Sequence, residues 1–216
     1  MKIEYLGHAC CLIENDKGNK FLFDPYTGVG YEMPSQVNAD VVFVSHGHFD
    51  HNYLDGVKNF SYLIAEEGSY NLLGTPIEAI PSWHDEKQGA LRGKNLIFKI
   101  KIDGLTLCHF GDLGEPYSLE LAERLVNADI LFIPVGGRYT IDAKQAKEYI
   151  ERIKPLAVIP IHYRPVDGKL DIAEIQDFLK EMTEYFIVPC STGELSLSRE
   201  LLDVGKTKIF YMERRI

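Results

Sequence analysis

The sequence predicts an α/β fold in which two mixed β-sheets pack together and helices cover them. Short apolar runs dominate the first third of the chain, whereas helix and strand patterns alternate from Ser118 onward. No Pro/Ser-rich linker, low-complexity segment or solenoid-type repeat interrupts this order. The 216 residues are enough for one domain with a large core, so we expect a single domain spanning residues 1–216.

The predicted elements of the first half are short strands separated by turn residues. Asn15-Asp16-Lys17-Gly18-Asn19 is one such turn, and Asp103-Gly104 is a strong hairpin turn between two apolar runs. A short helix is expected near residues 53–59. The expected strands cover residues 3–6, 9–14, 20–23, 41–44, 62–65, 77–80, 96–102 and 105–109.

The second half alternates between helices and strands, as βα units do. Ser118 and Asp142 are suitable N-caps, and Glu120 and Glu123 lie near the positive end of the first helix dipole. We expect helices over residues 118–126, 142–153 and 171–182, and strands over 129–133, 156–161 and 185–188.

The composition is that of an ordinary globular protein, with 45% hydrophobic and 25% charged residues. The 23 basic and 32 acidic residues leave a net charge of −9. This balance argues against a broad phosphate-binding surface, so no nucleic acid partner is expected. A small anionic substrate remains compatible, because divalent metal ions would offset the negative charge locally.

Cysteine spacing and hydropathy bear on the compartment. No pair among Cys10, Cys11, Cys108 and Cys190 has the CxxC spacing of zinc sites, so reduced thiols are expected. The N-terminus has no apolar segment of signal-peptide length, and no apolar run approaches the roughly 20 residues of a membrane helix. We therefore expect a cytoplasmic protein without a membrane span.

The richest segment is Ser45-His46-Gly47-His48-Phe49-Asp50-His51, which directly follows the apolar run at residues 41–44. It holds three of the seven histidines of the chain. A polar loop would be the simplest explanation, but neighbouring imidazoles without metal or charge partners would repel one another when protonated. The density of imidazole and carboxylate groups indicates a metal site.

Three further candidates also follow predicted strands. Taken alone, His84 would be a loop histidine, Asp112 a turn aspartate between glycines, and His162 a core histidine. Loops at strand ends are where α/β folds usually assemble their sites. Together with the histidine-rich segment they provide seven candidate ligands, which is enough for two metal ions with open positions for water.

The order His-x-His-x-Asp-His, a later lone His, a Gly-Asp turn and a final His resembles the metallo-β-lactamase fold over nearly the whole chain. Further short motifs resemble the small metal-dependent hydrolase branch that contains ascorbate-6-phosphate lactonase and the phosphodiesterase that cleaves N-acylphosphatidylethanolamine. The resemblance implies an αββα sandwich, with the site at one edge between the sheets. The short motifs are Gly7-His8, Phe23-Asp24-Pro25, Gly111-Asp112, Gly136-Gly137-x-Tyr139-Thr140 and Ile159-Pro160-Ile161-His162-Tyr163.

The resemblance also implies a ligand set. His46, His48 and His84 would bind the first metal. Asp50, His51 and His162 would bind the second, and Asp112 would bridge the two. Two divalent ions are expected, zinc first, although manganese or iron occurs in some members. Nitrogen and oxygen ligands without thiolate do not decide between them.

A two-metal site of this kind predicts a hydrolase. Two ions about 3.5–4 Å apart would share a bridging water and lower its pKa, giving a nucleophile for a small ester, lactone or phosphodiester. Asp50 would orient this nucleophile or take its proton, in addition to its ligand role. The alternatives are an RNA-processing nuclease of the same superfamily, which the net charge disfavours, and a non-catalytic metal-stabilised binding or sensor protein.

Several residues near these motifs are weaker candidates. Asp24 would either complete a turn or accept the free N–H of a ligand histidine. His8 and His109 would be supporting or proton-transfer groups, or ordinary hydrogen-bonded histidines. Asp85 would support the ligand His84 or be solvated, and Asp142 is more simply a helix cap.

Three residues beyond the ligands are candidates for substrate contact: Tyr139, Tyr163 and Arg164. Arg164 suits a phosphate or carboxylate, and a surface ion pair is its simpler alternative. The loops at residues 28–38 and 86–93 are expected to determine substrate specificity, but they contain no motif that identifies the substrate.

Overall fold

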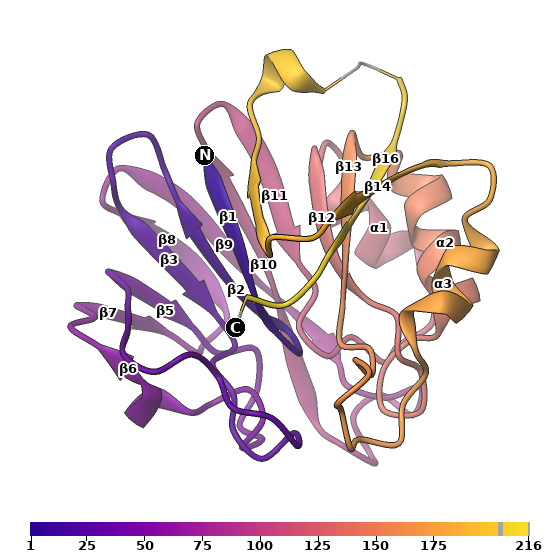
Figure 1. The fold of residues 1–216 in the computed structure, drawn as a ribbon, viewed down its shortest axis with the longest axis horizontal. Helices are drawn as coiled ribbons and strands as arrows, with labels where there is room; N and C mark the ends of the chain where they lie inside the picture. Colours follow the sequence, from indigo (N-terminus) through magenta and orange to yellow (C-terminus); the bar gives the residue numbers. More distant parts are fainter. Residues whose placement is uncertain (203–204, 216) are drawn as a thin grey trace.

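In a computed structural model, which describes residues 1–202 and 205–215, two β-sheets pack against each other, and the helices lie along one side of the molecule (Figure 1). Aromatic contacts join the sheets: the rings of Phe43 and Phe98 have centroids 5.0 Å apart, and those of Phe23 and Phe98 are 6.1 Å apart. This arrangement confirms the predicted α/β sandwich.

The six-stranded sheet contains most of the N-terminal strands. Its order is β15-β1-β2-β3-β5-β7, antiparallel from β15 to β3 and parallel from β3 to β7. The strands are β15 (Glu194–Ser196), β1 (Lys2–Gly7), β2 (Cys10–Glu14), β3 (Lys20–Phe23), β5 (Val41–Phe43) and β7 (Tyr62–Ile64).

The eight-stranded sheet is also mixed. Its order is β14-β16-β13-β12-β11-β10-β9-β8, parallel from β14 to β11 and antiparallel from β11 to β8. The strands are β14 (Phe186–Cys190), β16 (Lys208–Met212), β13 (Ala157–Ile161), β12 (Ile130–Pro134), β11 (Leu105–His109), β10 (Lys94–Ile102), β9 (Thr75–Trp83) and β8 (Gly68–Leu72). A small separate pair joins β4 (Val37–Asn38) and β6 (Val57–Lys58).

Buried apolar side chains of the six-stranded sheet alternate between two apolar layers, as expected from the period of a strand. Phe21 and Phe23 face the core between the sheets, whereas Leu22 faces the outer layer. Residues of the irregular segment 26–36, including Tyr26, Val29 and Met33, cover that outer layer together with Val37 and Val57 of the β4–β6 pair. A loop and a short strand pair therefore cover this face, where the αββα expectation placed helices.

The three α-helices in the described part of the chain gather beside β12, β13, β14 and β16 (Figure 1). They are α1 (Leu119–Leu125), α2 (Ala143–Ile153) and α3 (Ile175–Glu181). Both predicted N-caps are present: Ser118 accepts the N–H of Leu121, and Asp142 forms a capping box with Gln145. Asp142 is thus a helix cap.

Two predicted elements differ from the structure. Residues 53–59 form only a 3-10 turn, η1 (Leu54–Gly56), and then pair with β4 as β6, because strand pairing satisfies their backbone better than one isolated helical turn. The helix predicted from residue 171 begins at Ile175. The preceding Ala173 instead donates its N–H to the carbonyl of Gly136.

Some elements were absent from the sequence prediction: β4, β8, β15, β16 and a second 3-10 turn, η2 (Arg199–Leu201). All four cysteines are free thiols, as predicted. None of the helices in the described part of the chain has the length and apolar character needed to cross a bilayer.

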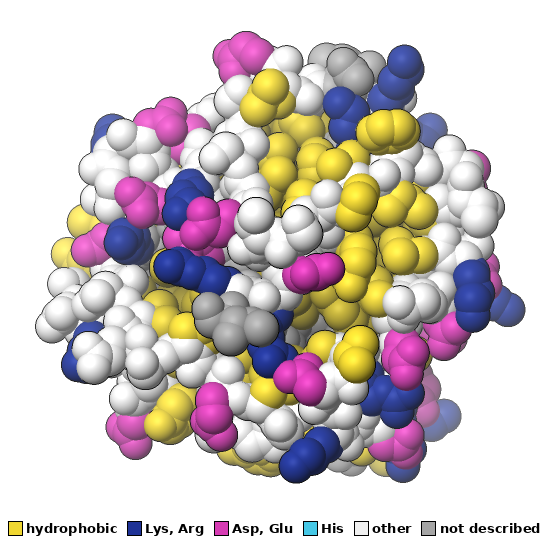
Figure 2. All heavy atoms as spheres, viewed as in Figure 1, with side chains coloured by type: hydrophobic (Ala, Val, Ile, Leu, Met, Phe, Trp, Pro, Cys, Tyr) yellow, Lys and Arg dark blue, Asp and Glu magenta, His cyan; other side chains and the backbone are white. Residues whose placement is uncertain are grey.

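One face of the molecule carries scattered charges of both signs, and hydrophobic side chains gather over the part where β14 and β16 lie (Figure 2). Strand β14 is an edge of the eight-stranded sheet, and Phe186 on it is 67% exposed. The site described below lies elsewhere, at the strand ends between the sheets.

Candidate metal centre

Six of the seven histidines meet where five strands end. The turn after β1 carries His8, and the loop after β5 carries residues 46–51. From the other sheet, β9, β11 and β13 are followed by His84, Asp112 and His162. Both sheets therefore contribute to one centre, as the strand-end argument predicted.

The side chains form overlapping groups whose ligand atoms lie within 4.8 Å of one another. One group contains His46, His48 and His84. A second contains His8, Asp50, His51 and His162. A third joins His46, His51 and Asp112 and so lies between the other two.

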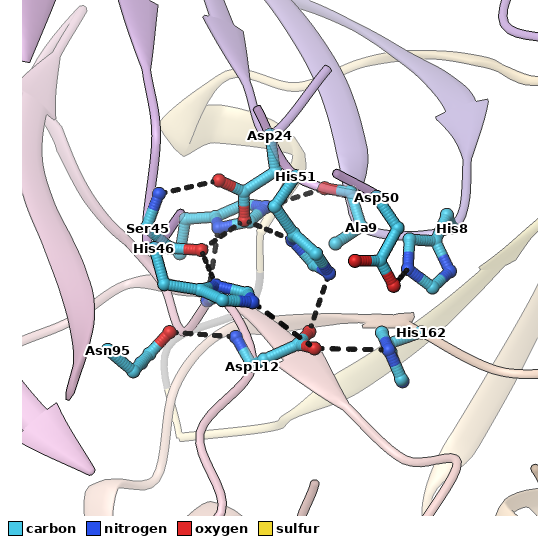
Figure 3. Close-up of polar contacts among 12 residues, drawn as sticks. His8, Ala9, Asp24, Ser45, His46, Asp50, His51, Asn95, Asp112 and His162 are labelled. Atoms are coloured by element: carbon cyan, nitrogen blue, oxygen red, sulfur yellow. Dashed lines mark hydrogen bonds and ion pairs between the residues drawn. The ribbon is translucent and has the colours of Figure 1, made fainter. Parts of the chain in front are cut away.

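Asp112 belongs to the third group and lies next to histidines of the other two; the residue is only 2% exposed, and side chains turn toward it from both sides (Figure 3). Its Oδ1 lies 3.1 Å from His51 Nε2. Its Oδ2 lies 3.3 Å from the Nε2 atoms of both His84 and His162, and 3.9 Å from His46 Nε2. The surrounding imidazoles hold the pKa of Asp112 well below its usual range, despite the opposing effect of burial.

Asp24, at the end of β3, fixes the orientation of two histidines. Its carboxylate accepts the backbone N–H and the hydroxyl of Ser45, each at 2.8 Å, and Nδ1–H of His51 at 3.0 Å. Because the Ser45 hydroxyl donates its hydrogen to Asp24, its oxygen accepts a hydrogen bond from His46 Nδ1–H, 2.9 Å away. Both imidazoles therefore turn Nε2 toward Asp112, which is the orientation a metal ligand requires.

The charge states of these two histidines differ in the metal-free protein. Burial, together with the charge of His51, lowers the pKa of His46 to about 3. Burial also opposes the charge on His51, but Asp112 and Asp24 on either side raise its pKa well above the ordinary value. His46 thus presents a neutral nitrogen, whereas His51 is a cation between two carboxylates.

Asn95 is a buried residue of the site that the sequence analysis missed. Its Oδ1 accepts the backbone N–H of Asp112 at 2.9 Å, and its Nδ2 donates to the carbonyl of Phe110 at 2.9 Å and to Ser82 Oγ at 2.8 Å. The amide thereby fixes the turn that carries Asp112. No local pattern in the sequence distinguishes it from an ordinary strand asparagine.

Three residues of this centre have a strained backbone conformation. His8, Asp24 and His162 have φ values of 54°, 45° and 52°, in the left-handed region that residues with a Cβ seldom adopt. The His162 N–H donates to the His8 carbonyl at 2.7 Å, which ties the two sheets together here. Such strain persists only where the surroundings enforce it, and it is common at functional sites.

Close backbone approach also holds two of the histidines. A Cβ on Gly114 would lie 2.4 Å from the carbonyl of His84, and one on Gly136 would lie 2.2 Å from the His162 carbonyl oxygen. Only glycine permits these contacts, so both loops pack directly against the segments that present His84 and His162.

Sequence and structure comparisons agree with this geometry. The family described as beta-lactamase superfamily domain matches residues 2–162. The chain belongs to the metallo-β-lactamase superfamily. This confirms the resemblance drawn from the histidine and aspartate motifs.

The most informative relatives are metal-dependent hydrolases. The chain is 34% identical over 208 residues to a UPF0173 metal-dependent hydrolase of Carboxydothermus hydrogenoformans, covering 82% of this chain and 91% of that one. It is 32% identical over 227 residues to one from Pelotomaculum thermopropionicum, with coverages of 90% and 98%. This metallo-β-lactamase superfamily member is thus a metal-dependent hydrolase.

A solved structure supports the same family assignment. A Thermotoga maritima protein, described as a candidate Zn-dependent hydrolase of the metallo-β-lactamase superfamily, superposes with a TM-score of 0.78 and 31% identity. The match covers 98% of this chain and 99% of that one.

His8 lies next to Asp50 in the centre of this metallo-β-lactamase superfamily member. Its Nε2 is 3.3 Å from Asp50 Oδ2, and its ring centroid is 4.3 Å from that of His162. Burial, followed by the charge of His162, lowers the pKa of His8 to about 4. The structure therefore brings His8 into the centre, beside the candidate ligands.

His109 lies outside the ligand groups, although it is fully buried. Its Nε2–H donates to the carbonyl of Ala9 at 2.8 Å, and its Nδ1 accepts the N–H of Gly111 at 3.2 Å. Both ring nitrogens are therefore occupied, and the ring stacks on Phe23. These contacts support the turn that leads to Asp112 and leave no proton for transfer to substrate.

The three candidates for substrate contact, Tyr139, Tyr163 and Arg164, also lie outside the ligand groups. The Tyr163 hydroxyl donates to the carbonyl of Met212 in the core. Arg164 forms an ion pair with Glu174, at 2.7 Å, and both line a cavity that contains none of the candidate metal ligands. Tyr139 is half-buried, and the guanidinium groups of Arg92 and Arg138 both lie over its ring, 5.4 and 5.7 Å from the ring centroid.

Asp85 organises the loop that the sequence left undefined. Its buried carboxylate accepts four backbone N–H groups, those of Lys87, Gly89, Leu91 and Arg92, at 2.7–3.0 Å. Burial opposes its charge, but these donors leave the pKa of Asp85 below the ordinary value. The carboxylate thus shapes residues 86–93 instead of contacting His84.

We expect Asp85→Ala to loosen this loop without unfolding the protein. Hydrogen bonds to a charged group contribute about 1.5–3 kcal/mol each, so amides of residues 87–92 should exchange at least about tenfold faster. Hydrogen exchange with mass spectrometry measures this, and the exposed neighbour variant Glu86→Ala is the matched control. Unchanged exchange in Asp85→Ala would contradict the role assigned to the carboxylate.

Proposed function

We propose that residues 1–216 form one hydrolase domain that binds two divalent metal ions, zinc in the first place, and cleaves a small ester, lactone or phosphodiester. The observation that carries the proposal is the convergence of two ligand groups on the buried carboxylate of Asp112. The description of the Thermotoga maritima relative as a candidate Zn-dependent hydrolase supports the choice of zinc.

The residues present fit such ions. Buried atoms of the centre make no hydrogen bond of regular geometry among the described residues, although some of them lie at ion-pair distance from one another; polar atoms left in this state are costly without a ligand to satisfy them. These atoms are His8 Nε2, His46 Nε2, His51 Nε2, His84 Nδ1, Asp112 Oδ1 and His162 Nδ1. Imidazole and carboxylate donors suit zinc, and also manganese or iron.

The proposed ligand sets follow the observed groups. His46, His48 and His84 would hold one ion, while Asp50, His51 and His162 would hold the other, with Asp112 between them. When bound, such ions supply a water nucleophile at neutral pH and polarise the electrophilic group of the substrate.

Residues of the chain itself would then position the attacking water and orient the metal-binding histidines. Asp50, whose side chain is 18% exposed, would accept the proton of the attacking water, and His8 at 3.3 Å would hold its carboxylate in position. Asp24 and Ser45 would keep His46 and His51 in the binding tautomer. No serine or cysteine nucleophile is required.

Metal analysis and a substrate screen test this function. The full chain, reconstituted with zinc, manganese or iron, is expected to contain two ions and to hydrolyse members of a panel of lactones, esters and bis(p-nitrophenyl) phosphate. Asp50→Ala should lower the rate by about 10²–10⁴-fold, the usual contribution of a positioned general base. The exposed variant Asp16→Ala serves as its control.

Other outcomes would decide for the alternatives. Two tightly held ions with no turnover of any class would indicate a metal-stabilised binding or sensor protein. Cleavage of RNA at physiological salt would indicate a nuclease. Absence of bound metal would refute the proposed function altogether.

A further inference from the structure

A cavity of about 390 Å³ opens beside the first ligand group. Its walls include His46 and His48, the segment after β7, and residues from the start of β10. Arg92 and Lys94 are its basic residues. A substrate whose reacting group lies at the metal ligands would extend into this space.

The backbone of Arg92 is fixed at the edge of the metal centre. Its N–H donates to Asp85 Oδ2 at 2.7 Å. The next residue, Gly93, accepts the N–H of His84 through its carbonyl at 3.1 Å. These hydrogen bonds therefore fix the backbone of Arg92 next to the strand end that presents His84.

The side chain of Arg92 is half-buried and lies over the Tyr139 ring, with Cζ 5.4 Å from the ring centroid. Arg138 contacts the same ring at 5.7 Å, but it forms an ion pair with Asp171. In the described part of the chain, Arg92 has no carboxylate within ion-pair distance. Tyr139 thus holds one neutralised and one unneutralised guanidinium.

The other charges of the cavity are more exposed. Glu66 and Glu67 line it from the segment after β7, and Lys94 lines it from β10, all three with exposed side chains. Solvent screens exposed charges, whereas a half-buried guanidinium retains more of its field. Arg92 is therefore the least exposed of the Lys, Arg and Glu side chains that line the cavity beside His46 and His48.

We propose that Arg92 is a specificity-determining residue that binds an oxyanion of the substrate, a carboxylate or a phosphate, beside the metal centre. The planar guanidinium offers two parallel N–H donors that match either group. This inference rests on the proposed function, since it places the substrate between the ligands and Arg92. It assigns to Arg92 the anion-binding role that the sequence analysis considered for Arg164, which Glu174 already neutralises.

A binding experiment tests the inference without turnover. Inorganic phosphate is titrated into the metal-loaded full chain by isothermal calorimetry, after the metal content of each variant has been matched to the wild type. Arg92→Gln is expected to weaken phosphate binding by about tenfold or more, because it removes a charge-assisted bidentate contact. Arg92→Lys should fall between the two, and Arg164→Gln should bind as the wild type does.

A second measurement addresses the substrate. The ratio of kcat/KM for 4-nitrophenyl hemisuccinate to that for neutral 4-nitrophenyl butyrate should fall by about tenfold in Arg92→Gln and remain unchanged in Arg164→Gln. Equal phosphate affinity in the wild type and Arg92→Gln, or no phosphate binding to either, would overturn the inference. Failure of the wild type to hydrolyse either ester would count against ester substrates in the proposed function, while the calorimetry would still decide the role of Arg92.

Discussion

Asp112→Ala is expected to leave the protein without its full metal content and without hydrolytic activity. Asp112 is the carboxylate within 3.1–3.9 Å of four imidazoles, so its removal takes a ligand from both proposed ions. Bound metal contributes several kcal/mol to catalysis, so the fall in kcat/KM should be at least about 10³-fold. Plasma mass spectrometry of the purified variant measures the metal, and the substrate screen measures the rate.

Two variants make this result specific. Asp112→Asn keeps the shape and one oxygen but removes the charge, so it should retain part of the metal and little activity. Asp177→Ala removes an exposed carboxylate that pairs with Lys180, and it should match the wild type in both measurements. Two ions and a wild-type rate in Asp112→Ala would refute its bridging role.

Asp24→Ala is expected to cost about 3–5 kcal/mol of unfolding free energy, the usual effect of removing one partner of a buried charge pair. The carboxylate is fully buried and accepts two hydrogen bonds from Ser45 and one from His51. All three donors would lose their partner. Metal affinity should also fall by about 10–100-fold, because His51 would no longer be oriented. The exposed variant Asp55→Ala is the matched control.

The difference in unfolding free energy between the wild type and Asp24→Ala should depend on pH. This dependence follows from the pKa shifts of Asp24 and His51 in the metal-free protein. Burial raises the pKa of Asp24, but the attraction of His51 outweighs it, so the pKa lies below the ordinary 3.8. Its contribution to stability is therefore present above about pH 4 and lost as the pH falls through the lowered pKa. The raised pKa of His51 gives a contribution that is present below 6.5 and lost as the pH rises through it.

The stability difference between the wild type and Asp24→Ala should thus be largest between about pH 4 and 6.5 and should decrease on both sides. Urea unfolding in the presence of a chelator, at a series of pH values, measures it. A difference that does not change with pH would show that packing, and not charge, accounts for the role of Asp24.

Much of the fold and of the candidate site could be predicted from local signals. The apolar run before His46 marks a buried strand, and the same reasoning applies before Asp112 and His162. Strand ends of packed sheets converge, so seven candidate ligands from distant segments could be placed together without a contact map. The structure brings them together as that argument requires.

Other features depend on contacts that leave no trace in the local sequence. Asn95 lies in a strand with no unusual sequence pattern, yet its side chain accepts the backbone N–H of Asp112. Ser45 orients His46 by accepting a hydrogen bond from the Nδ1–H of its ring. The loop over the outer layer of the six-stranded sheet has no periodicity, because it covers a surface without pairing to it. No local sequence pattern distinguishes Arg92 from Arg164. Only the folded structure shows that Glu174 neutralises Arg164, whereas Arg92 lies over the Tyr139 ring.

The division of the ligands between the sheets has a consequence for how the protein matures. β1 and β5 belong to one sheet and β9, β11 and β13 to the other, so neither half of the sandwich could complete the proposed metal sites alone. On the ribosome, His8 emerges long before His162, and capture of the proposed ions would wait for nearly the whole sandwich. The binding free energy would then add to the cooperative stability of both sheets together, and only completed, correctly packed chains would load metal.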